Sequence, residues 1–233
     1  MKSLLRRLSD WCSGVPQTQS RHGRVQLAEP RSPLLIVVEG PHDAEFLRRI
    51  SALLHGVHAE LPALAQAEAA GQVSFLPAGG GNLWSWPARL GPLSLRQHIY
   101  DREIAPVTQQ RQQLIDAINA RPNCQAILTR KRAMENYLDP LAILQAGGVN
   151  IEFSDDDSVP LLVAQAVHRS LAEGPSWAEL SSRARKRRCE RAKCWLNSRA
   201  VECMTPELLQ ERDPDGEIAG WLRVANQLME QAR

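Results

Sequence analysis

Short apolar runs alternate with segments of helical periodicity over the first two thirds of the chain. Residues 34–40 (LLIVVEG) form a continuous, largely β-branched run, which is typical of a strand buried on both faces of a parallel sheet. Pro41 suits the first turn of a helix, and apolar residues then recur at helical spacing as far as Gly56. This pattern predicts a strand that leads directly into a helix.

The same alternation continues along the chain and predicts an α/β fold. We expect a mostly parallel sheet of four to five strands, joined by right-handed crossovers and flanked by helices. The further strands are expected within 72–81, where a short strand is followed by a glycine turn, and at 95–103 and 124–129, with a fifth at 150–153. The helices are expected at 58–70, 107–120 and 133–148.

Beyond Asp157 only helical periodicity remains. The predicted helices cover 159–174, 177–200, 205–212 and 216–232, and Thr205 followed by Pro206 is a good helix start. Residues 1–31 mix Ser, Gln, Pro and Arg without sustained periodicity. The chain is therefore expected to have a tail at 1–31, an α/β domain at 32–157 and an α-helical carboxyl-terminal appendage at 158–233.

Composition narrows the class of protein. The chain is 43% hydrophobic and 23% charged, as in globular proteins with a packed core. Its longest strongly apolar run, 34–38, is far shorter than the roughly 18 residues of a membrane-spanning helix, and charges interrupt the first 14 residues where a signal peptide is apolar. Five cysteines without a CxxC pair argue against a disulfide scaffold or a zinc site. We expect a cytoplasmic protein with no membrane partner.

The formal net charge of +2 hides an uneven distribution. Residues 1–31 carry six Lys or Arg against two acids, and residues 183–193 carry seven against one. Basic stretches of this kind suit a polyanionic partner, since phosphate contacts release counterions. A solvated, charge-rich helix face explains them equally well.

Acidic residues follow three of the predicted strands. Glu39 and Asp43 come after the first strand, Asp101 and Glu103 after the third, and Glu135 after the fourth. In an open parallel sheet, these positions share the edge where ligands bind. Carboxylates crowded together there repel one another unless a cation neutralises them, and Mg²⁺ prefers such oxygen ligands. The joint pattern predicts a site for one or two divalent metal ions.

Each acid also has a structural explanation when it is taken alone. Asp43 can complement a helix dipole, Glu135 can be an acid at a helix amino terminus, and Asp101 can be a turn residue. His55 and His58, three residues apart on one predicted helix, are assigned to packing or solvent, because no further ligand lies nearby in the sequence. Trp84 and Trp86, beside a glycine-rich turn, can stack on bases or cover the core.

Three sequence elements carry a resemblance to a known family. An apolar strand precedes Glu39-Gly40, with Asp43 following; Asp101-Arg102-Glu103 follows a later strand; and residues 130–138 read RKRAMENYL. These elements resemble the first motif, the Asp-x-Asp motif and the "arginine, then Glu-Asn-Tyr-Leu" element of Toprim-domain nucleases. The likeness is to the Toprim domain of the overcoming-lysogenization-defect (OLD) family endonucleases and covers residues 33 to 140. Lys193 sits in a position similar to a lysine late in OLD nucleases.

The resemblance implies a role for each matching residue. It implies that Glu39 acts as general acid/base or metal ligand, and that Lys193 stabilises phosphate charge in the transition state. Glu103 departs from the Asp-x-Asp motif, in which the second acid is usually Asp. The implied catalytic set is Glu39, Asp101, Glu103 and Lys193, and the implied ligands of Mg²⁺ or Mn²⁺ are Glu39, Asp43, Asp101, Glu103 and Glu135. The residues expected to follow a nucleic-acid backbone are Arg130, Lys131, Arg132, Arg185, Lys186, Arg187 and Arg188.

The sequence and the resemblance leave two candidate functions. The first is a metal-dependent nuclease acting on DNA or RNA, similar to effectors of phage-defence or plasmid systems. Because the sequence has no P-loop, any ATP must be used by a separate ATPase partner. The alternative is a non-catalytic Toprim module that binds nucleic acid or protein. The sequence leaves a homo-oligomer open.

Overall fold

The computed structural model describes residues 33–79, 95–171 and 174–232, and these residues form one compact unit. The predicted tail at 1–31, together with Gly80, Gly81, Trp84 and Trp86, lies outside the described residues. Within the described residues four strands form one sheet: β1 (Leu34–Val38), β2 (Val73–Pro77), β3 (Arg96–Tyr100) and β4 (Cys124–Leu128). The described α-helices are α1 (Pro41–Val57), α2 (Leu64–Ala69), α4 (Val107–Asn119), α5 (Pro140–Gly147), α6 (Val159–Arg169), α7 (Ser182–Trp195), α8 (Pro206–Arg212) and α9 (Glu217–Gln231).

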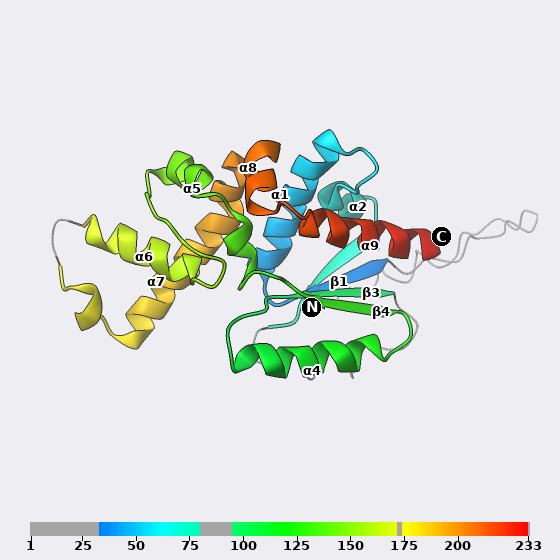
Figure 1. Ribbon diagram of the computed structural model, residues 1–233, viewed down its shortest axis with the longest axis horizontal. Helices are drawn as coiled ribbons and strands as arrows, with labels where there is room; N and C mark the ends of the chain where they lie inside the picture. The colour runs from blue at the N-terminus through cyan, green and yellow to red at the C-terminus, as the bar shows by residue number, and fades with distance from the viewer. Residues whose placement is uncertain (1–32, 80–94, 172–173, 233) are drawn as a thin grey trace, which may run out of the picture. The chain divides into compact units, whose positions relative to one another are not determined.

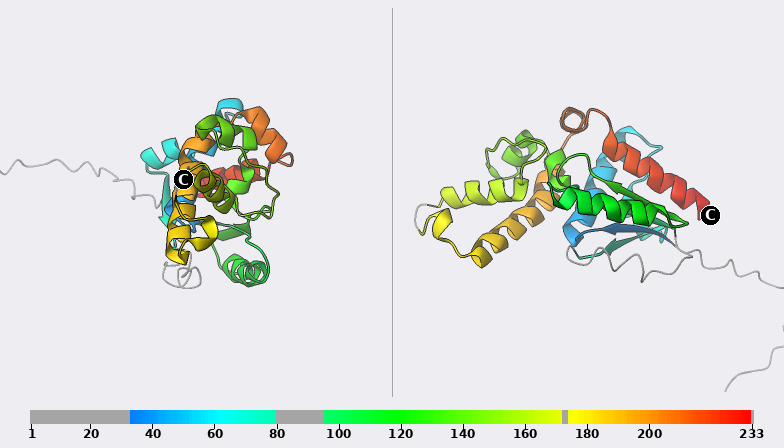
Figure 2. Two further views of the ribbon diagram at one scale, coloured as in Figure 1. Left: turned by 90° about the vertical axis from the view of Figure 1, so that its left-hand side faces the viewer. Right: turned by 60° about the horizontal axis from the view of Figure 1, so that its bottom comes forward.

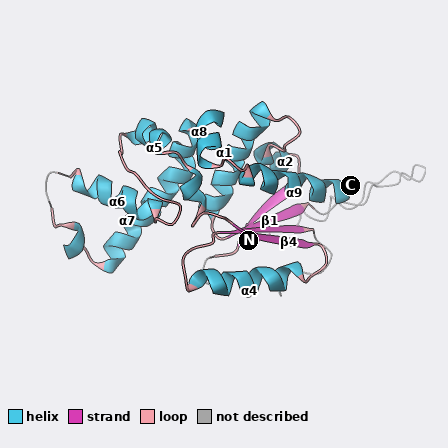
Figure 3. Ribbon diagram, viewed as in Figure 1, coloured by secondary structure: helices cyan, strands magenta, loops and turns pink. Residues whose placement is uncertain are grey.

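The sheet has the order β2-β1-β3-β4, and every neighbouring pair is parallel. The α/β class and the parallel sheet that the alternating pattern predicts are therefore confirmed. Figure 3 shows the strands as a narrow layer among helices. In Figure 1, α4 lies on one side of the strands, and α1 and α9 lie on the other. The left view of Figure 2 shows α4 (green) standing apart from the remaining helices.

Alternation along the strands fills a core on each face of the sheet. Val37 and Tyr100 point toward α4, where Leu114, Ile115 and Ile118 complete a small cluster. Their neighbours in the strands belong to a larger cluster on the opposite face, which also takes in side chains of α1 and α9. Burial on both faces explains why the strand sequences are continuous apolar runs. The change to helices beyond Asp157 is thus a change of secondary structure within one compact unit.

The fifth strand that the sequence predicts at 150–153 is wrong, since these residues form no strand. Ile151 is buried in the larger core, and the Arg212 guanidinium lies 4.9 Å from the centroid of the Phe153 ring. The carbonyl groups that follow are bound by a side chain, because Asn136 Nδ2 donates to the carbonyls of Ser154 and Asp157. An apolar tract can therefore be buried here without a strand partner.

Two predicted helices are shorter than the sequence pattern suggests. The helix expected at 133–148 is divided into a 3₁₀ turn, η1 (Met134–Tyr137), and α5. Pro140 disfavours helical geometry at Asp139, whose side chain instead caps α5 by accepting a hydrogen bond from the Leu141 N–H. The helix expected at 58–70 is reduced to α2 (Leu64–Ala69), beyond Pro62.

The helix expected at 177–200 is also subdivided. It consists of a 3₁₀ turn, η2 (Trp177–Glu179), then α7, then a π-helical segment, η3 (Leu196–Ala200). A further 3₁₀ turn, η4 (Val201–Cys203), follows. No helix in the described ranges combines the length and apolar character needed to cross a lipid bilayer.

Candidate functional site

The carboxyl edge of the sheet places acids from separate segments near one another. Asp101 follows β3 directly, and Asp43 lies in the first turn of α1, which begins two residues after Glu39. Glu135 lies in η1, beyond β4. Asp43, Asp101 and Glu135 are almost completely buried, with 1%, 3% and 1% of their surfaces exposed. We call Asp43, Asp101 and Glu135 the acid cluster.

Lys193 brings the acid cluster together. Its Nζ lies 2.9 Å from Asp43 Oδ1, 3.5 Å from Glu135 Oε1 and 3.7 Å from Asp101 Oδ2. One ammonium group is therefore within ion-pair distance of carboxylates from three different elements. About a quarter of the Lys193 side chain is exposed (25%), whereas the acids that it meets are almost completely buried.

The end of α7 is fixed by the segment that follows it. The π-helical segment η3 packs against both α1 and α5 and buries Leu196, Asn197 and Ala200. Asn197 lies one helical turn beyond Lys193, and its Nδ2 donates a 2.6 Å hydrogen bond to Glu135 Oε1. Irregular helical segments of this type often occur at functional sites. Here η3 holds an amide against the same carboxylate that the Lys193 ammonium of α7 approaches.

Backbone amides orient two members of the acid cluster. The Gly40 N–H donates to Asp43 Oδ2 at 2.8 Å, and the Met134 N–H donates to Asp101 Oδ1 at 3.0 Å. In each carboxylate the other oxygen is the one that faces Lys193. The two side chains are thus held by one oxygen and present the second to a cation.

Glu39 is held by a different cation, Arg111 of α4. Arg111 Nη2 donates to Glu39 Oε2 at 2.9 Å, and its Nη1 contacts Oε1, which also accepts the Asp101 N–H at 3.0 Å. Both side chains of this pair are largely buried, with 11% and 13% exposed. A bidentate pair of this kind fixes a carboxylate strongly. Glu39 therefore adjoins the acid cluster but has its own partner.

The charges at this edge do not balance. Glu39 and the acid cluster supply four carboxylates against the two cations Lys193 and Arg111, a formal excess of two negative charges. Burial raises the pKa of Asp101 well above its usual range; Lys193 opposes the rise, and the neighbouring carboxylates add to it. Burial also raises the pKa of Glu39, against the hydrogen bond and charge of Arg111. Excess negative charge in a buried site favours the uptake of protons or of a cation.

The pKa of Lys193 changes in the sense expected from its partners. Burial alone lowers the pKa of an ammonium group, but the carboxylates of Glu135, Asp101 and Asp43 outweigh it and raise the pKa of Lys193 well above its ordinary value. Lys193 is therefore fully protonated at neutral pH. It acts here as a fixed positive charge.

Glu103 is not brought to the acid cluster. Its backbone adopts a left-handed conformation with φ of 58°, and its Oε2 pairs with Arg132 Nε at 3.2 Å. The expectation that Glu103 binds metal beside Asp101 therefore has no geometric support. Two acids separated by one residue point to the same side only where the backbone is extended. Here β3 ends at Tyr100 and the chain turns, so Glu103 does not point with Asp101.

The basic residues expected to contact nucleic acid fall into two groups. Arg130 pairs with Asp215 at 2.6 Å, Lys131 contacts Asp155, and Arg132 pairs with Glu103, so the charges of the first group are compensated within the chain. The second group, Arg185, Lys186, Arg187 and Arg188, lies on α7. Among the described residues, none of these four side chains has an ion pair or hydrogen bond.

Arg111 and Asn197 are site residues that the sequence patterns did not single out. The helix predicted at 107–120 did carry a signal for Arg111, which lies three and four residues before the inward-facing Leu114 and Ile115 and therefore on the same face. A charged residue on a buried helix face needs a partner. Asn197 had no comparable signal, because its position depends on the π-helical geometry of η3.

His55 of α1 and His58, which follows α1 directly, have structural partners. His55 Nδ1 lies 2.6 Å from the Leu61 carbonyl oxygen, and His58 lies 3.6 Å from Glu60. In the described ranges, no group of three or more His, Cys, Asp or Glu side chains is arranged to hold a metal ion. At the acid cluster the position facing the carboxylate oxygens is taken by the Lys193 ammonium. The donor set is nonetheless all oxygen and carries excess negative charge, which fits a hard divalent cation.

Comparisons with known proteins add no family to this description. No protein-family model matches the chain, and neither a curated protein nor a solved structure matches it. The function is therefore inferred from the geometry and charge of the site.

Proposed function

We propose that the chain is a metal-dependent nuclease that hydrolyses phosphodiester bonds in DNA or RNA, of the Toprim class that the sequence resembles. One observation carries this proposal. Acids from three separate segments meet a single lysine at the carboxyl edge of a parallel sheet. Asp43, Asp101, Glu135 and Lys193 are among the residues to which the resemblance gives roles in metal binding and phosphate stabilisation.

The acid cluster supports binding of Mg²⁺ or Mn²⁺. Asp43, Asp101 and Glu135 would hold the ion, and one divalent charge would offset the formal excess of two negative charges at this edge. The ion would supply Lewis-acid polarisation of a phosphoryl oxygen and a more acidic bound water.

The residues of the chain have roles of their own in this proposal. Lys193 holds a permanent positive charge beside the acids, and with a bound cation compensating those acids its charge is available to a phosphate oxygen. Glu39 is oriented by Arg111, and its raised pKa makes it a better proton acceptor near neutral pH than an ordinary carboxylate. Glu39 is therefore the proposed general base.

The proposed nucleic-acid surface is α7. Arg185, Lys186 and Arg187 lack ion-pair partners among the described residues, so their charges remain for a phosphate backbone. Arg130, Lys131 and Arg132 are weaker candidates, because contact with phosphate requires them to leave carboxylates of the same chain.

The biological setting is proposed from the resemblance alone. A cytoplasmic effector of phage defence or plasmid maintenance, activated by a separate ATPase, agrees with a sequence that has no P-loop. A homo-oligomer is compatible with this setting.

A non-catalytic Toprim module is the second candidate, and a specific observation favours it. Lys193 and Arg111 already supply cationic partners to the acids, which is how a purely structural ion network is built. Such a module would bind nucleic acid or protein and would need no metal.

Nuclease activity can be tested directly. We expect the purified full chain to cleave plasmid DNA or total RNA with Mg²⁺ or Mn²⁺ and to lose this activity in EDTA. Asp101→Asn should lower the cleavage rate by about 100-fold or more, since it removes a negative charge that attracts Lys193 and would help to hold the metal ion. Asp116→Asn, which alters an exposed acid of α4 hydrogen-bonded to Gln112, is the matched control.

Two results would count against the nuclease. Cleavage at the wild-type rate by Asp101→Asn would show that the activity arises elsewhere. Absence of cleavage, together with calorimetry showing no Mn²⁺ binding at millimolar metal, would favour the non-catalytic module.

A further inference from the structure

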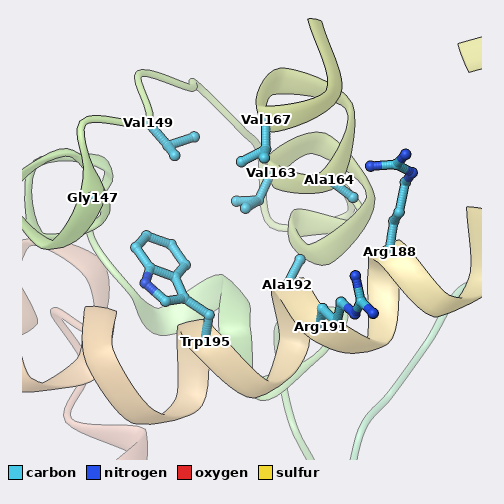
Figure 4. Close-up of a pocket in the computed structure, with 9 residues that line it drawn as sticks. All are labelled: Gly147, Val149, Val163, Ala164, Val167, Arg188, Arg191, Ala192 and Trp195. Atoms are coloured by element: carbon cyan, nitrogen blue, oxygen red, sulfur yellow. The ribbon is translucent and has the colours of Figure 1, made fainter. Parts of the chain in front are cut away.

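A cavity of about 350 Å³ lies between α6, α7 and the end of α5. Figure 4 shows Val149, Val163 and Val167 around it, with the indole of Trp195 against one side. Arg188 and Arg191 lie at the opposite side. We call this space the α7 cavity. Its volume is at the lower end of the range of about 300–1,000 Å³ that is usual for ligand pockets.

The α7 cavity and the acid cluster lie on different faces of the same helix. Arg188, Arg191 and Trp195 are separated by three and four residues, so they share one face of α7. Lys193 and Asn197 lie on another face, toward Glu135. The cavity is therefore a separate site, although it is next to the acid cluster along the chain.

The position of the Trp195 ring is fixed by a glycine. A Cβ on Gly147 would lie 2.7 Å from Trp195 Cζ2, so the indole occupies the space that a side chain at the end of α5 would need. The ring therefore lies against the end of α5 and supplies an aromatic part of the cavity lining. Flat aromatic walls opposite aliphatic side chains suit a planar ligand.

A second hollow continues from the α7 cavity along the helix. Its volume is about 210 Å³, and it is lined by Ala184, Arg187, Arg188 and Arg191. Arg188 and Arg191 line both spaces. Within the parts of the chain that the structure describes, the side chains of these three arginines have no ion pair or hydrogen bond. Unpaired guanidinium groups around a hollow favour phosphate, which they bind through paired N–H groups.

We propose that the α7 cavity binds one unpaired base of a single-stranded nucleic acid, and that the arginine hollow binds the phosphates beside it. The proposal rests on the proposed nucleic-acid substrate and names the form of that substrate. A base inserts between Trp195 and the valines, and Arg187, Arg188 and Arg191 hold the adjoining backbone. Because the cavity lining offers few polar groups, binding depends on the face of the base and not on its identity.

Binding to synthetic strands in EDTA tests the base site without cleavage. Fluorescence anisotropy with a labelled ten-residue thymidine strand is compared with an abasic strand of the same length. We expect the full chain to bind the abasic strand about tenfold more weakly, since base stacking on an aromatic ring is lost.

Substitutions at the cavity mouth give the matched comparison. Val167 is 44% exposed, so Val167→Glu adds a negative charge at the cavity without disturbing the core. This variant should bind the thymidine strand no better than the abasic strand. Leu144→Glu, which alters an equally apolar side chain that is 39% exposed and does not line the cavity, should keep the wild-type difference.

The arginine hollow is tested by charge removal. The double variant Arg188→Gln with Arg191→Gln should weaken binding of both strands by about tenfold or more, because phosphate contacts are lost in each. Arg183→Gln removes a charge from the same helix outside both spaces and should have a smaller effect.

Equal binding of thymidine and abasic strands by the wild-type chain would overturn the proposal. So would equal effects of Val167→Glu and Leu144→Glu. If laurate displaces the thymidine strand, and the chain binds thymidine and abasic strands equally, the cavity is a site for aliphatic anions instead. Base-dependent binding without any cleavage would refute the nuclease and leave the base site standing, whereas cleavage with equal binding would refute only the base site.

Discussion

The ammonium group of Lys193 compensates the acid cluster in the way that a bound cation does. It reaches Asp43, Asp101 and Glu135 within 3.7 Å, and none of these carboxylates has more than a few per cent of its surface exposed. Removing one partner of a buried charge pair leaves the other uncompensated, which costs more than the pair itself contributes. The stability of the cluster therefore depends on this one side chain.

Replacement of Lys193 by methionine tests that dependence. We expect Lys193→Met to lower the free energy of unfolding at pH 7 by about 3 kcal/mol, at the lower end of the range for buried pairs because the lysine side chain is 25% exposed. Since the pKa of Lys193 is raised by ionised acids, its contribution is present at neutral pH, where it is protonated, and is lost as pH rises through the folded-state pKa.

Urea denaturation measures this effect, and Lys186→Met, at an exposed position of the same helix, is the control. Millimolar Mn²⁺ should restore part of the lost stability of Lys193→Met if the acids bind metal. Equal stability of the two variants would show that the lysine is not needed to compensate the acids.

The raised pKa of Asp101 predicts a pH dependence of stability with the same sign as that of Lys193, in a lower pH range. Its pKa is raised in the folded chain, so between about pH 3.9 and the folded-state pKa the folded state binds more protons than the unfolded state. Its ionisation therefore lowers the free energy of unfolding as pH rises through this window. Asp101→Asn should remove that decline and be more stable than wild type at pH 7.

Urea denaturation between pH 4 and pH 8 in EDTA measures the difference between the two proteins. Asp116→Asn should retain the wild-type slope, since its carboxylate is exposed. A wild-type slope in Asp101→Asn would contradict the assigned pKa direction.

At the scale of the helices and strands, the contact of α5 with α7 depends on the absence of a side chain at Gly147. Gly147 ends α5, and Trp195 ends α7 directly beside it. The Trp195 ring lies against the end of α5, where Gly147 leaves room for it. Trp221 of α9 does reach the sheet, since its carbonyl accepts a hydrogen bond from Gln97 Nε2 of β3 at 2.8 Å.

Two glycine substitutions separate packing from helix propensity. Gly147→Ala should lower the free energy of unfolding by about 1–3 kcal/mol, because the new Cβ meets the indole at 2.7 Å. Gly220→Ala, in α9 with no atom within 4 Å of the new Cβ, should raise it by up to about 1 kcal/mol through helix propensity. Thermal and urea unfolding of both variants measure the contrast, and effects of the same sign would contradict this explanation.

At the scale of the whole molecule, the metal proposal predicts a linkage between Mn²⁺ and unfolding. A ligand at 100 times its Kd stabilises the folded state by about 2.7 kcal/mol, which corresponds to a rise in Tm of about 5–10 °C for a chain of this size. EDTA should reverse the rise. Asp43→Asn should abolish it and Asp116→Asn should retain it, as measured by differential scanning calorimetry. An unchanged Tm of the wild-type chain in millimolar Mn²⁺ would contradict metal binding.

Local sequence was sufficient for most of the sheet and for part of the site. The apolar run at 34–38 and the acids after three strands predict a parallel sheet with carboxylates at one edge, and the structure places Asp43, Asp101 and Glu135 together there. Glu103 could not be placed, because its orientation depends on a left-handed turn after β3. The false strand at 150–153 has a similar cause, since its apolar residues are buried by contacts from distant parts of the chain.

The sequence by itself determined the class of fold, because the periods of apolar residues in strands and helices are local properties of the chain. It also determined which strand ends carry acids. Only the tertiary structure decided which cations meet those acids: Arg111 at Glu39, and Lys193 among the acid cluster. Glu39 and Arg111 lie 72 residues apart in the sequence. Arg111 and Lys193 come from two different helices, and the packing of these helices in the fold sets the distances between the charges. Long-range electrostatic pairing depends on those distances, and no local pattern encodes them.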